Sequence, residues 1–83
     1  METYVVIASS NIDDVPVFVG DEDEANGIIE EISHLKWVHP LCRVACEAMD
    51  RDKMGDMVTV RLAKFSNGGM VESRCAVEID DMD

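Results

Sequence analysis

This chain has few positive charges. Only seven Lys and Arg residues stand against eighteen Asp and Glu residues, which gives a formal net charge of −11 over 83 residues. A surplus of carboxylates repels phosphate backbones and anionic lipid surfaces. The sequence therefore predicts no direct binding to nucleic acid and no membrane binding, and it is better matched to a protein partner with a basic surface. Solubility alone is the commoner cause of such a surplus.

Long apolar runs and a secretory leader are also missing. The longest apolar run, YVVIA at residues 4–8, is far shorter than the roughly 20 residues that cross a bilayer. The first ten residues lack a basic region before an apolar one. The three cysteines, Cys42, Cys46 and Cys75, are an odd number at spacings that indicate no disulfide framework. These absences predict a cytoplasmic protein with reduced thiols.

Familiar catalytic and cofactor motifs do not occur in the sequence. There is no phosphate-binding loop, dinucleotide fingerprint, nucleophile elbow or C-x-x-C pair, and the acidic run 21–24 lacks the spacing of a calcium loop. We therefore assign no catalytic, cofactor-binding or metal-binding residue and lean against an enzyme, although a site completed across a subunit interface stays open. The length predicts one domain over residues 1–83, with a frayed acidic tail at about 80–83.

The first half of the chain predicts two strands and a helix. Residues 3–10 and 15–20 are strand-like and flank the polar segment 11–14, and the first strand is expected to be central and covered on both faces. Asp21 is the expected N-cap of a helix, with Glu24 three residues further on. The expected buried face of this helix carries Ala25, Ile28, Ile29 and Ile32. Gly27 is expected to weaken the helix and to allow a close approach to the sheet.

Residues 40–53 are compatible with a strand or a helix, and we favour the helix. As a strand, the segment has one mixed face, whereas a helix beginning at Pro40 has an apolar stripe. The stripe consists of Leu41, Val44, Ala45, Ala48 and Met49.

A β-hairpin is predicted near the C-terminus, because Asn67-Gly68 suits a tight turn with two positive φ angles. Alternation places Val58, Val60 and Leu62 on the core side of the first strand of the hairpin. On the second strand, the core side is predicted to carry Val71, Cys75, Val77 and Ile79. The order β-β-α-α-β-β then predicts an α+β two-layer sandwich, with a mainly antiparallel four-stranded sheet and the helices on one face.

One stretch has metal-ligand chemistry. His34, His39, Cys42 and Cys46 form H-x₄-H-x₂-C-x₃-C, whose atoms suit zinc but whose spacing is not that of common zinc modules. A pairing of Cys42 with His39 or His34 as a nucleophile and base is the less favoured alternative. We favour structural cysteines, with Trp37 at the edge of the core.

Two functional hypotheses remain. The first is a small non-enzymatic binding or adaptor module, whose acidic surface or sheet edge recognises a protein partner or a second copy of the chain. The excess of apolar side chains in the first two strands suits a homodimer. The second hypothesis is an acidic mimic of nucleic acid that inhibits a basic nucleic-acid-binding protein, and it rests on the charge of −11.

Overall fold

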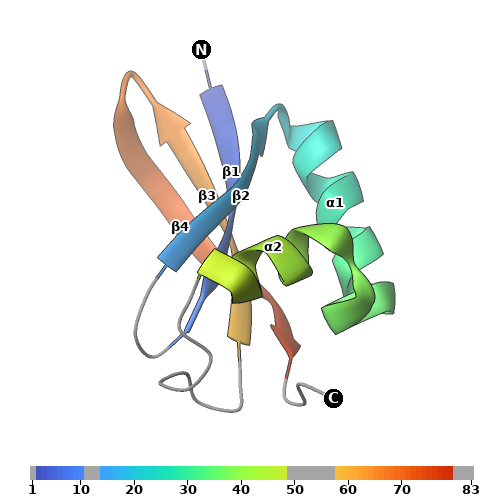
Figure 1. The fold of residues 1–83 in the computed structure, drawn as a ribbon. Coiled ribbons are helices and arrows are strands. Elements are labelled where there is room, and N and C mark those ends of the chain that lie inside the picture. The colour runs from blue at the N-terminus through green and yellow to red at the C-terminus, as the bar shows by residue number, and fades with distance from the viewer. Residues whose placement is uncertain (1, 11–13, 49–57, 80–83) are drawn as a thin grey trace.

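A four-stranded antiparallel sheet and two helices make up the fold (Figure 1). The computed structural model describes residues 2–10, 14–48 and 58–79, with the side chains of Trp37, Cys46 and Ala48 outside the described part. The elements follow the chain as β1 (Glu2–Ser9), β2 (Asp14–Gly20), α1 (Glu22–Leu35), a 3₁₀ turn η1 (Lys36–Val38), α2 (Pro40–Ala48), β3 (Val58–Ser66) and β4 (Gly69–Ile79). The α+β class and the order β-β-α-α-β-β predicted from the sequence are confirmed.

The strands lie in the order β2-β1-β3-β4, so β1 is central as predicted. Tyr4, Val6 and Ala8 of β1 point to one face and are buried in the clusters that also contain residues of α1 and α2. Val5 and Ile7 point to the opposite face, where they remain partly exposed. The described helices therefore cover one face of the sheet. We expected β1 to be covered on both faces, and the described helices cover it on one face only.

Helix α1 begins as the sequence predicts. The Glu24 amide donates to the Asp21 side chain at 2.9 Å, and this bond satisfies one of the unpaired amides of the first turn. The predicted apolar face is confirmed: Ala25 and Ile32 are buried, and Ile28 and Ile29 pack against the same cluster. Gly27 does not serve a close helix approach, because it is exposed and a Cβ atom there would meet nothing within 4 Å.

Residues 40–48 form the predicted helix α2, and 49–53 lie outside the described residues. The buried face differs from the predicted stripe. Cys42 and Ala45 are buried, whereas Val44 is 57% exposed. Cys42 packs in the cluster that includes Ile32, and Ala45 packs with two residues of the sheet, so the small side chains face the strands and Val44 is directed away. The predicted stripe members Ala48 and Met49 lie outside the described side chains.

The predicted hairpin is confirmed at its turn and corrected along its second arm. Asn67 and Gly68 have φ angles of 54° and 85°, as a type I′ turn requires. Val71 and Cys75 are exposed rather than buried. The pairing of β3 with β4 shifts register twice, between Val60 and Arg61 and between Lys64 and Phe65. Each shift inserts a residue into the longer strand and breaks the alternation of faces from which the sequence prediction was made.

Candidate functional site

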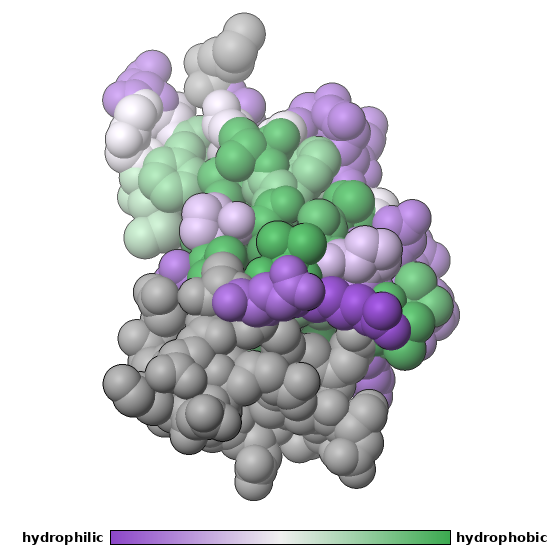
Figure 2. All heavy atoms as spheres, in the orientation of Figure 1, coloured by the Kyte–Doolittle hydropathy of each residue, from purple (hydrophilic) through white to green (hydrophobic). Residues whose placement is uncertain are grey.

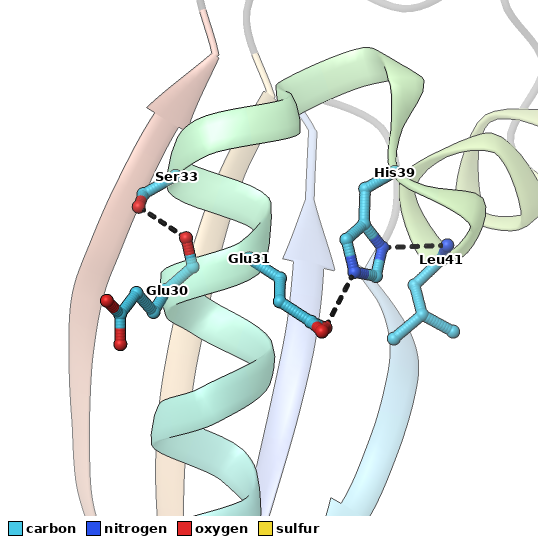
Figure 3. Close-up of polar contacts among 5 residues, drawn as sticks. All are labelled: Glu30, Glu31, Ser33, His39 and Leu41. Carbon is cyan, nitrogen blue, oxygen red and sulfur yellow. Dashed lines mark hydrogen bonds and ion pairs between the residues drawn. The ribbon is translucent and has the colours of Figure 1, made fainter.

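His39, in the stretch with metal-ligand chemistry, connects the two helices (Figure 3). Its Nδ1 accepts the Leu41 amide at 3.1 Å, and its Nε2 lies 3.4 Å from Oε2 of Glu31. The His39 carbonyl accepts the Arg43 amide, which is the first hydrogen bond of α2. His39 is therefore the N-cap of α2, with Pro40 at the favoured first helical position.

The two contacts favour one tautomer of the neutral His39 ring. Nδ1 can accept the Leu41 amide only when it carries no proton, so the neutral ring carries its proton on Nε2 and donates it to Glu31. The ring is buried, whereas the Glu31 side chain is 60% exposed. Both ring nitrogens of His39 are thus engaged in contacts with other parts of the fold, one with α1 and one with the first turn of α2.

Four residues, His34, His39, Cys42 and Cys46, have metal-ligand chemistry, although we assigned none of them as a ligand, and the three whose side chains are described do not come together as a metal site. His34 is exposed in the last turn of α1, Cys42 is buried in the core, and the Cys46 side chain lies outside the described side chains. Among the described residues, no three His, Cys, Asp or Glu side chains are placed to hold a metal ion. The side chain of Trp37, predicted at the core edge, also lies outside the described part.

A second polar cluster lies on the helix face of the sheet. Tyr4 of β1 pairs with Lys64 of β3, and Lys64 pairs with Glu72 of β4. Lys64 Nζ lies 2.9 Å from Oε2 of Glu2, and this hydrogen-bonded ion pair raises the pKa of Lys64. Burial raises the pKa of Tyr4, and a hydrogen bond to the Glu22 carboxylate raises it further.

The raised pKa values keep Tyr4 protonated and Lys64 charged. A catalytic tyrosine or lysine base needs the opposite shift, towards neutral pH. The cluster of Glu2, Tyr4, Glu22 and Lys64 therefore joins the start of α1 to the sheet, and the raised pKa values do not favour Tyr4 or Lys64 as a base.

The two edge strands of the sheet differ in how they are covered. Strand β2 packs beside α2 and contains Pro16, which has no amide to offer to another strand. Strand β4 is longer, and all its residues from Gly69 to Cys75 are exposed. An exposed edge strand presents backbone donors and acceptors to any extended chain. The outer edge of β4 is therefore the interaction surface that the described fold offers, and we call residues 69–75 the β4 edge.

Apolar side chains accompany this edge. Met70 is 58% exposed and Val71 is 61% exposed, and both lie next to the hairpin turn. Figure 2 shows a separate group of hydrophobic side chains, over the strands above α2 and bordered by hydrophilic side chains on the side of α1. Exposed apolar groups beside unpaired backbone are typical of a surface that is covered by a partner.

Charge is distributed unevenly between this edge and α1. All the described Asp and Glu residues are exposed. Helix α1 carries five carboxylates and no Lys or Arg, whereas residues 58–79 carry three basic and two acidic side chains, a net charge of +1. The β3–β4 turn and α1 lie on opposite sides of the molecule (Figure 1). A partner at the β4 edge therefore avoids most of the described acidic surface.

Comparison with protein-family models, with curated proteins and with solved structures finds no match to this chain. No helix within the described ranges is long and apolar enough to cross a membrane. The fold and the site geometry are therefore the basis for a functional proposal.

Proposed function

We propose that this protein is a small non-enzymatic protein-binding module, and that the β4 edge is its recognition element. An extended segment of a partner adds to the sheet as a fifth strand and pairs its backbone with β4. Affinity comes from the main-chain hydrogen bonds and from covering Met70 and Val71. The observation that carries this proposal is the uninterrupted exposure of Gly69–Cys75 on an edge strand.

The other edge and the polar clusters support the same choice. Pro16 and α2 make β2 a poor site for strand addition. His39, Tyr4 and Lys64 are engaged in contacts that hold the helices and strands together. A binding role at β4 leaves all these contacts in place.

Mimicry of nucleic acid is the alternative, and one observation favours it. Asp21, Glu22, Asp23 and Glu24 are consecutive and exposed at the start of α1. A basic groove would be attracted to that helix end, and binding would weaken steeply with salt. In this alternative the recognition surface is α1, with no role for β4.

Affinity capture from cell extract with three matched baits distinguishes binding at the β4 edge from mimicry of nucleic acid by α1. The baits are the wild-type protein, an edge variant with Met70→Lys and Val71→Lys, and an acid variant with Glu22→Gln, Asp23→Asn and Glu24→Gln. Lysine on an exposed strand opposes pairing with another strand. We expect the proteins captured by wild type to be lost with the edge variant and kept with the acid variant. The reverse result, with capture abolished by salt, would favour mimicry and contradict the proposal.

A further inference from the structure

We propose that the partner at the β4 edge is a second copy of this chain, paired antiparallel with its β4 about a two-fold axis through Ser73. The inference rests on the proposed function and specifies its partner. The two four-stranded sheets then form one continuous sheet of two copies. In such a symmetric interface each residue contact occurs twice.

The charges of β4 define the register. Antiparallel pairing centred on Ser73 places Glu72 directly opposite Arg74 of the second copy, and Arg74 opposite its Glu72. Glu72 pairs with Lys64 and Arg74 with Leu62, so both side chains lie on the helix face and can meet across the interface. Centring the axis on Glu72 or on Arg74 instead places two like charges directly opposite each other, which is unfavourable.

The same register covers the exposed apolar residues. Val71, the residue inserted at one register shift of β4, comes to lie opposite Cys75 of the second copy, and Cys75 pairs with Arg61 within its own chain. Met70 comes to lie opposite Ala76 of the second copy. Val71 and Met70, both more than half exposed in the single chain, thus gain neighbours.

Charge distribution favours a like partner at this edge. Two chains of charge −11 repel each other at most orientations. The β3–β4 hairpin carries a net charge of +1, and its turn lies on the side away from α1 (Figure 1), whereas the C-terminal end of β4 packs against α1. An approach by residues 69–75 of the two chains, which carry one acidic and one basic side chain each, therefore brings together two parts with balanced charge.

Charge exchange between Glu72 and Arg74 tests the register. Sedimentation velocity from about 10 µM to about 1 mM spans the affinities expected for a small interface. We expect wild type to dimerise, and Glu72→Arg and Arg74→Glu each to weaken the dimer by about tenfold or more, because like charges then face each other twice. An equimolar mixture of the two variants should form a heterodimer, since every facing pair is again opposite in charge. Circular dichroism melts check that both variants are folded.

A short bismaleimide crosslinker provides an independent readout. In the Val71→Cys variant, the new thiol lies opposite Cys75 of the second copy, and each maleimide adds one thiol. Mass spectrometry of the digested product should show residues 71 and 75 joined between chains. The matched control Ser66→Cys, at the far end of β3, should give no such product with Cys75 of another chain.

The outcomes separate this inference from the proposed function. A wild-type monomer at every concentration overturns the homodimer. If that monomer still captures partners that are lost with the edge variant, the proposed function stands with another partner. A dimer that is unchanged by either charge variant and gives no crosslink from residue 71 to residue 75 overturns the β4 register.

Discussion

His39 and Glu31 connect α2 to α1, with His39 Nε2 lying 3.4 Å from Glu31 Oε2. The same ring caps α2 through Nδ1, so one side chain sets both the start of the second helix and its position beside the first (Figure 3). Exposure of the Glu31 carboxylate makes that contact the weaker of the two. The cap to Leu41, which is part-buried, is therefore the larger contribution of His39 to stability.

Replacement of His39 should separate these contributions. We expect His39→Ala to lower the free energy of unfolding by about 0.5 to 2 kcal/mol, because it removes the N-cap. His39→Asn should lose clearly less, since asparagine is a preferred N-cap, although it gives up the contact with Glu31. Urea unfolding followed by circular dichroism gives both values. Equal losses for the two variants would show that the cap is not the main role of the ring.

Two glycines should respond in opposite directions to alanine. Gly27→Ala should stabilise the protein by about 0.5 to 1 kcal/mol, because alanine has the higher helix propensity and a Cβ there meets nothing within 4 Å. Gly68→Ala should destabilise it, because Gly68 has a φ of 85° that alanine rarely adopts. Thermal melts of the two variants and of the wild type measure both changes in stability. A destabilised Gly27→Ala variant would mean that the exposed helix face is packed in solution.

The features that the sequence predicted well are local. The Asp21 cap needs only the residues of one helical turn, and the Asn67-Gly68 turn needs only two positive φ angles. The exposure of Val71 was missed because register shifts arise when β4 pairs with β3, and nothing within β4 shows where they fall.

The candidate site depends on long-range structure even more strongly. Alternating charges in β4 are visible in the sequence, but the position of β4 at the sheet edge follows from the order β2-β1-β3-β4. One feature of the sequence could have indicated that His39 is an N-cap. Pro40 suits the first helical position, which places the preceding residue at the N-cap, yet histidine is not among the usual capping residues.

The orientation of α2 can be tested with leucine at two neighbouring positions. Ala45→Leu adds three heavy atoms to a buried side chain packed against Ala8 and Val58, and should cost about 1 to 3 kcal/mol through overpacking. Val44→Leu enlarges an exposed side chain and should change stability by less than about 0.5 kcal/mol. Chemical denaturation measures both. A loss of stability with Val44→Leu as large as that with Ala45→Leu would restore the apolar stripe predicted from the sequence, in which both residues are buried.

Alkaline pH should weaken the cluster that joins α1 to the sheet. The pKa of Tyr4 and that of Lys64 are both raised in the folded state, so the folded protein holds these protons more tightly than the unfolded chain does. Stability from both groups is therefore complete below their ordinary pKa values of about 10 and is lost as pH rises through the folded values. Unfolding free energies measured at stepwise higher pH should fall in that range, and the Tyr4→Phe, Lys64→Met double variant should show a smaller fall.

Tyr4 can be followed directly, because it is the single tyrosine of the chain. Titration of its ultraviolet absorbance should give a pKa above the ordinary value in the folded protein. Glu22→Gln should lower that pKa but leave it raised, since burial is the larger cause and the carboxylate is the smaller. Glu30→Gln removes an exposed carboxylate from the same helix and is the matched control. Equal shifts in the two variants would mean that Tyr4 senses the general charge of α1 and has no specific contact with Glu22.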